Sequence, residues 1–115
     1  MEFPTSTVER RLLGAASRRK GMREEQVLVR FLQDRGFAAE KISRMYKRGP
    51  DLTVPLLGAD RTVEIKIRSN GFRELYRWLA GAELLIVRAD RQPPLVILPL
   101  RFAAEIAAAA ERGRP

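Results

Sequence analysis

The sequence contains neither cysteine nor histidine among its 115 residues. Disulfides, thiolate zinc sites, cysteine nucleophiles and histidine general bases are therefore excluded. No apolar run approaches the roughly 18 residues needed to span a bilayer, and the N-terminal segment lacks the apolar stretch of a signal peptide. We expect a cytoplasmic protein with no membrane segment, in which any hydrolytic chemistry uses carboxylates, lysine and an oxygen-bound metal ion.

Positive charge is what the chain has in excess. The formal net charge is +8, and residues 1–50 hold twice as many basic as acidic residues. Such a balance suits nucleic acid, whose phosphates dominate sequence-independent affinity, although anionic membrane surfaces and simple solubility also tolerate it. The length supports one small domain over residues 1–115 with a modest single core.

The first part of the chain favours helices. Residues 8–16 are expected to form a short helix, residues 17–21 a basic break, and residues 22–35 a second helix that stops at Gly36. An apolar stripe marks the buried side of that second helix: Val27, Leu28, Phe31 and Leu32. Residues 37–42 then read as a strand, followed by a basic loop.

The remainder alternates between strand and helix patterns. Residues 51–57 and 61–67 predict a hairpin, and Phe72, Leu75, Tyr76 and Leu79 recur at the spacing of a helix packed on a sheet. Residues 82–90 and 94–100 are near-continuous apolar runs, which are typical of strands covered on both faces. Residues 101–112 predict a last helix. The fold class is therefore α/β, in the order α-βββ-α-ββ-α.

The hairpin carries acidic and basic side chains that alternation would gather on one face. Glu64 and Lys66 share a face because side chains alternate along a strand. If the turn of Gly58, Ala59 and Asp60 centres on residues 59 and 60, Thr53 lies opposite Lys66 and Asp51 joins the same face. A slip of one residue would send Asp51 to the other face.

These residue types fit phosphodiester hydrolysis. The reaction needs a hard cation, and carboxylate oxygens such as those of Asp51 and Glu64 are its preferred ligands. The carbonyl of Ile65 could add a third oxygen, and Lys66 could position or deprotonate the attacking water or stabilise the charged transition state. The alternative is a solvated hairpin face with an incidental Glu and Lys pair.

The segments RGPDLTVPLLGADRTVEIKIR and RRKGMREEQVLVRFLQDRGFAAEK resemble the PD-(D/E)xK nuclease superfamily, and within it the archaeal-type Holliday junction resolvases. The similarity covers residues 18–103 and leaves 1–17 as an N-terminal extension. It implies a restriction-endonuclease-like core, with a mixed central sheet flanked by helices. It also implies that Glu25, Asp51 and Glu64 bind Mg²⁺, which Mn²⁺ can replace, and that Lys66 assists the attacking water. Glu24 competes with Glu25 as the helical acid.

The resemblance further implies a homodimer that acts on duplex or branched DNA. Basic residues around the predicted site would hold the phosphate backbone without reading sequence. These are Arg18, Arg19, Lys20, Arg23, Arg44, Lys47, Arg48, Arg68 and Arg73. The alternative for these side chains is a solvated surface.

Two classes of function are thus open. The first is a magnesium-dependent DNA endonuclease, for which a Holliday junction or other branched DNA is one candidate substrate. The second is a non-catalytic nuclease-fold module that binds DNA or a partner, such as an accessory protein of a phage or mobile element. An RNA-directed nuclease is less favoured, because no aromatic-rich strand of the kind that stacks single-stranded RNA is visible.

Overall fold

The computed structural model describes residues 13–42 and 49–115, with the side chains of the first helix described from Arg23 onward. The chain divides into two compact units, Met1–Ser69 and Asn70–Pro115. Each is described by itself. The expected helix over residues 8–16 lies largely outside the described residues, as does most of the basic loop after Ile42.

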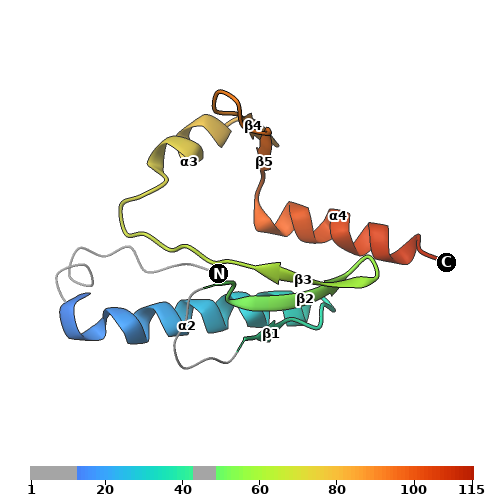
Figure 1. Cartoon of the computed structure of the whole chain (residues 1–115), viewed down its shortest axis with the longest axis horizontal. Helices are drawn as coiled ribbons and strands as arrows, with labels where there is room; N and C mark the ends of the chain where they lie inside the picture. The colour runs from blue at the N-terminus through green and yellow to red at the C-terminus, as the bar shows by residue number, and fades with distance from the viewer. Residues whose placement is uncertain (1–12, 43–48) are drawn as a thin grey trace. The chain divides into compact units, whose positions relative to one another are not determined.

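The first unit contains one long helix, α2, over Leu13–Asp34 (Figure 1). The predicted basic break at residues 17–21 is wrong, because helical structure runs through it without interruption. Gly21 costs only about 1 kcal/mol relative to alanine in a helix interior, and the arginines and lysine before it are good helix formers. A single glycine therefore does not end the helix.

The end of α2 follows the prediction. Gly36 has φ of 91°, its N–H donates to the carbonyl of Gln33 at 3.0 Å, and the N–H of Phe37 donates to the carbonyl of Leu32 at 3.1 Å. These two bonds form the Schellman motif, which needs a residue in the left-handed region after the helix. Leu32 and Phe37 both pack against the core, so the cap also turns the chain back under the helix.

Three antiparallel strands follow: β1 over Glu40–Lys41, β2 over Leu52–Leu56 and β3 over Ala59–Val63, in the order β1-β2-β3. The predicted hairpin register is wrong. Thr53 pairs with Thr62 rather than Lys66, because the turn centres on Leu57 and Gly58. The displacement is four positions, and an even displacement keeps the paired residues of β2 and β3 on their predicted faces. The carboxylate of Asp51, outside the ladder, meets Glu25 of α2 instead of Glu64 and Lys66.

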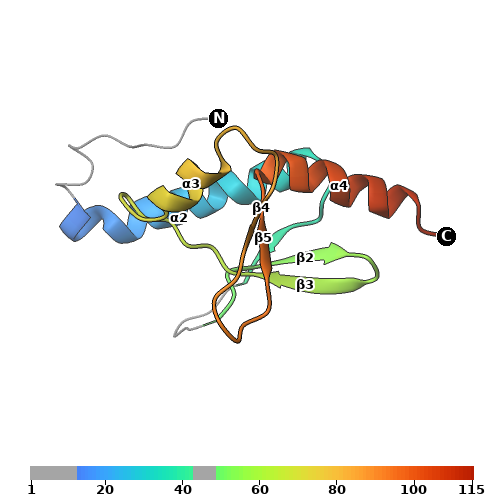
Figure 2. The ribbon, with the colours of Figure 1, turned by 90° about the horizontal axis from the view of Figure 1, so that it is seen from above.

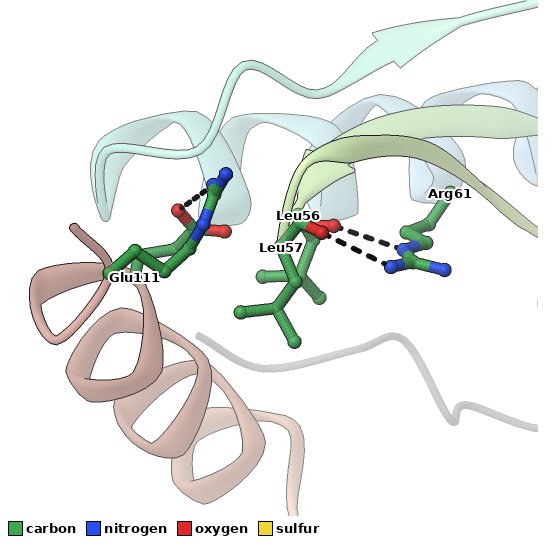
Figure 3. A network of polar contacts seen from close by, with 5 residues as sticks. Leu56, Leu57, Arg61 and Glu111 are labelled. Carbon is green, nitrogen blue, oxygen red and sulfur yellow. Dashed lines mark hydrogen bonds and ion pairs between the residues drawn. The ribbon is translucent and has the colours of Figure 1, made fainter.

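Arg61 closes the β2–β3 turn from within β3. Its Nε donates to the carbonyl of Leu56 at 3.0 Å and its guanidinium reaches the carbonyl of Leu57 at 3.4 Å (Figure 3). Leu57 and Gly58 both have positive φ, at 53° and 83°. Positive φ at both central residues is the signature of the type I′ hairpin turn, whose usual sequence is Asn-Gly.

The core of the first unit lies between α2 and the sheet. Val29, Ala39, Leu52 and Val54 are buried, and partly buried side chains pack around them: Leu32, Phe37, Val63 and Ile65. Part of the predicted helical stripe is therefore wrong, since Val29 is the deepest of the α2 side chains from Arg23 onward and Val27 is 37% exposed. The arc that faces the sheet is rotated from the predicted stripe toward Val29.

The second unit consists of α3 over Arg73–Leu79, β4 over Leu85–Val87, β5 over Leu95–Ile97 and α4 over Leu100–Arg112. Strands β4 and β5 pair antiparallel in a sheet of their own (Figure 2). In the described residues the strands thus form two small antiparallel sheets rather than one mixed sheet, within a small mixed α/β protein. The restriction-endonuclease-like arrangement stays a prediction.

Two packing predictions for the second unit are wrong. On β4 and β5 the directly opposed Ile86 and Val96 are 70% and 56% exposed, so that face of the sheet is uncovered. On α3, Leu75 is half-buried, whereas Phe72 and Tyr76 are exposed. The α4 helix buries Ala104 and ends with an ion pair between Arg114 and Glu111 at 2.9 Å (Figure 3).

No helix in the described ranges combines the length and apolarity that crossing a membrane would require.

The left-handed conformation of Leu57 predicts a stabilising substitution. A side-chain-bearing residue pays about 1–2 kcal/mol in this region, and asparagine pays less because it visits it readily. Leu57→Asn creates the favoured Asn-Gly turn and should raise the free energy of unfolding in urea by about 1 kcal/mol. Leu57→Ala keeps most of the penalty and serves as the control; equal stability of the two variants would contradict the strain argument.

Candidate metal and phosphodiester site

Asp51 ties three strand ends together. Its N–H donates to the carbonyl of Val63 at 2.7 Å, and its carbonyl accepts the N–H of Ile42 at 2.9 Å. Its side-chain Oδ2 accepts the N–H of Ile65 at 2.6 Å. The bond to Val63 is one residue out of the β2–β3 register, which pairs Val63 with Leu52. The β2–β3 ladder therefore ends here, and the next amide of the second strand, that of Ile65, donates to the carboxylate of Asp51 instead of to a backbone carbonyl.

Glu25 reaches the same point from α2. It lies one helical turn before the buried Val29, so the packing of that residue on the sheet aims Glu25 at the sheet edge. The carboxyl group of Asp51 lies close enough to that of Glu25 to raise its pKa. The Nζ of Lys41 on β1 lies 3.8 Å from Oε2 of Glu25. Two acids from distant segments and one lysine thus meet at the border of the core.

The pKa of Glu25 is raised above its ordinary value. Burial is the main cause, and the negative charge of Asp51 adds to it. Lys41 acts in the opposite direction, and the hydrogen bond to Asp51 also favours the protonated form of Glu25. Burial and the charge of Asp51 thus outweigh the opposing effect of Lys41 on the pKa of Glu25.

Glu64 and Lys66 lie just beyond the end of β3 and pair with each other. Nζ of Lys66 is 3.5 Å from Oε1 of Glu64, and both side chains are more than half exposed. Alternation is as predicted, since Val63 and Ile65 turn toward the core while Glu64 and Lys66 turn outward. The predicted role of the Ile65 carbonyl stays a prediction; its amide supports Asp51.

The structure distinguishes between Glu24 and Glu25, the two candidates for the helical acid of the site. Glu24 is 5% exposed, whereas Glu25 is the one whose carboxyl meets Asp51 and Lys41. Among the described side chains, Glu25 is therefore the better candidate for a metal ligand.

Within residues 13–42 and 49–115, no three acidic side chains gather as a metal-binding group. The pair of Glu25 and Asp51 supplies hard oxygen donors. Mg²⁺ commonly binds one or two carboxylates and completes its shell with water and substrate phosphate oxygens. The residues present fit such an ion, with Glu64 outside the pair.

The predicted basic rim is described only in part. The backbone of Arg18, Arg19 and Lys20 belongs to α2, with their side chains outside the description, and Arg44, Lys47 and Arg48 lie outside the described residues. Arg23 and Arg68 are exposed in the first unit, and Arg73 is exposed on α3 of the second.

Lys41 is the site residue that sequence reasoning missed. It follows the buried Ala39 by two positions, so strand alternation alone would have turned it toward α2. The spacing of residues 39 and 41 was thus the available signal.

Comparison of the chain with family models, with curated proteins and with solved structures finds no match.

The raised pKa of Glu25 predicts a pH dependence of stability. The folded state holds the Glu25 proton more tightly than the unfolded state, so the contribution of this group to stability is fully present below the ordinary value of 4.5 and is lost as the pH rises through the raised pKa. Glu25→Gln should flatten this slope and raise the free energy of unfolding at pH 7. Urea titrations at several pH values measure it, with the exposed Glu40→Gln as control. An unchanged slope in Glu25→Gln would contradict the assignment.

The carboxylate of Asp51 predicts a difference between two substitutions. Asp51→Ala leaves the half-buried amide of Ile65 without its acceptor and should lower the free energy of unfolding by about 1–3 kcal/mol. Asp51→Asn keeps an oxygen acceptor and relieves the repulsion with Glu25, so it should lose less. Chemical denaturation of both variants tests this, and equal losses would remove the structural role of the bond.

Proposed function

We propose that this protein is a divalent-metal-dependent hydrolase of DNA phosphodiester bonds, with Glu25 and Asp51 as the carboxylate ligands. The observation that carries the proposal is the approach of these two acids, which come from α2 and from the residue before β2, with the Nζ of Lys41 3.8 Å from Oε2 of Glu25. Like charges held together cost free energy unless a proton or a cation relieves them. A site that gathers them at the rim of a core is a candidate for cation binding.

Each residue of the chain has a distinct role in this proposal. Bound Mg²⁺ would supply charge neutralisation at the phosphate and activation of water. The amide of Ile65 fixes one oxygen of Asp51 and so orients the carboxylate. Lys41 offsets the charge of Glu25, and Lys66 would place or deprotonate the attacking water.

The substrate is proposed from charge and from the resemblance. A net charge of +8 favours a polyanion, and the exposed Arg23 and Arg68 lie in the same unit as the acids. The order Pro50-Asp51 and Glu64-Ile65-Lys66 resembles the PD-(D/E)xK nucleases, from which the restriction-endonuclease-like core, the homodimer and the preference for branched DNA are carried over as proposals.

Cleavage of a labelled panel tests the proposal. The panel holds a four-way junction, a flap, a linear duplex and a single strand, each with Mg²⁺, with Mn²⁺ and with EDTA. We expect metal-dependent cutting that Asp51→Asn and Glu25→Gln abolish. Lys66→Ala should slow cutting by about 10²- to 10⁴-fold while leaving DNA affinity within a few fold.

Glu24→Gln is the matched control, because it changes the adjacent residue in the same way and leaves the pair with Asp51 intact. Loss of cutting in both glutamine variants would contradict the assignment to Glu25. Tight binding of any panel member without cutting in either metal would instead favour the non-catalytic accessory module. The pairing of Glu64 with Lys66, away from Glu25 and Asp51, supports this second candidate function.

A further inference from the structure

Helix α3 presents an aromatic strip to the surface. Phe72 is the residue immediately before the helix, and Tyr76 lies four positions later, within the helix. Tyr76 is 76% exposed and Phe72 is 42% exposed. Leu75 and Leu79 face inward instead. We call Phe72, Tyr76 and the adjoining Arg73 and Arg77 the α3 strip.

The backbone fixes the head of this strip. Phe72 has φ of 64° and ψ of 14°, a left-handed conformation that bulky residues rarely adopt. Its carbonyl accepts the N–H of Tyr76 at 3.2 Å. This bond closes the first backbone turn of the helix between Phe72 and Tyr76.

Two guanidinium groups border the rings. Arg73 is three positions from Tyr76 and four from Arg77, which are the spacings of surface neighbours on a helix. Arg77 is ion-paired with Glu74, whereas Arg73 is exposed. Rings that offer a π-face beside positive charge match a nucleotide, whose base stacks and whose phosphate is anionic. Charge complementarity with DNA therefore favours a nucleic acid over a purely apolar partner.

We propose that the α3 strip stacks an unpaired base of the substrate, with Arg73 on the adjoining phosphate, and so selects DNA that contains unpaired bases. This deepens the proposed function and rests on DNA being the substrate. In an intact duplex the faces of the bases are stacked on one another and not available to Tyr76. Gaps, flaps and open junctions offer such faces.

The test measures binding in EDTA, where no cutting is needed. The probe is a duplex with a short single-stranded gap that contains one 2-aminopurine, compared with a fully paired duplex carrying the same base. We expect the protein to quench the gapped probe, and Tyr76→Ala to weaken its binding by roughly tenfold. Binding of the paired duplex should change less than twofold. Tyr76→Phe keeps the ring and should retain both the quenching and the affinity.

Trp78→Ala is the matched control. Trp78 is 51% exposed on the same helix, but residues two apart do not face each other, so it lies outside the strip. Equal losses for Tyr76→Ala and Trp78→Ala, or equal losses for gapped and paired DNA, would overturn the proposal. So would a change of oligomeric state in Tyr76→Ala by analytical ultracentrifugation with DNA affinity unchanged, because the strip would then be a protein interface.

The two proposals fail separately. Tyr76-dependent binding of the gapped probe without metal-dependent cutting would contradict the proposed hydrolase activity and support base stacking on the α3 strip. Asp51-dependent cutting that Tyr76→Ala leaves unchanged on every member of the panel would support the hydrolase activity and contradict base stacking on the α3 strip.

Discussion

The hydrogen bond from the amide of Ile65 to the carboxylate of Asp51 is the interaction on which the first unit depends. It forms where the β2–β3 ladder ends, and it replaces a backbone acceptor with a charged one, which makes it stronger than a neutral bond. The same aspartate holds Ile42 and Val63 through its backbone, so it joins the ends of all three segments. One residue therefore closes the sheet and also presents its carboxyl group to Glu25.

Because Asp51 both closes the sheet and contributes a carboxyl group to the site, the site lies at the edge of the core rather than in an open loop. Val29 and Leu52 draw α2 and the sheet together by burial. Glu25 and Asp51 are each close in sequence to one of those residues, so the packing that stabilises the unit also brings the acids into contact. The raised pKa of Glu25 is a consequence of that packing. Folding and the charge of the site are thus coupled, and a cation or a proton that relieves the repulsion also stabilises the fold.

The sequence predicted what local patterns determine. The order of helices and strands, the stop at Gly36 and the faces of Glu64 and Lys66 follow from caps and alternation. The register of the β2–β3 hairpin was not predicted, because leucine is an unusual residue at the left-handed turn position of Leu57. Glu64 and Lys66 keep their predicted faces because the observed register differs from the predicted one by an even number of residues. The contact of Glu25 with Asp51 and the approach of Lys41 are tertiary, and periodicity cannot rank Glu24 against Glu25. Strand pairing in the second unit is likewise non-local, since apolar runs such as that of Ile86 specify a strand but not its neighbours.

Lys66 lies in the stretch between β3 and α3 that has no regular secondary structure. The backbone of a lysine on a strand is held by the hydrogen bonds of the sheet, whereas here the neighbouring backbone anchor is the Ile65 amide, which donates to Asp51. Ordering the long side chain of Lys66 carries an entropic cost, and that cost is incurred when the substrate binds. In the proposed reaction, substrates that help to seat the ammonium group would gain rate more than affinity, so discrimination would operate by induced fit at the chemical step.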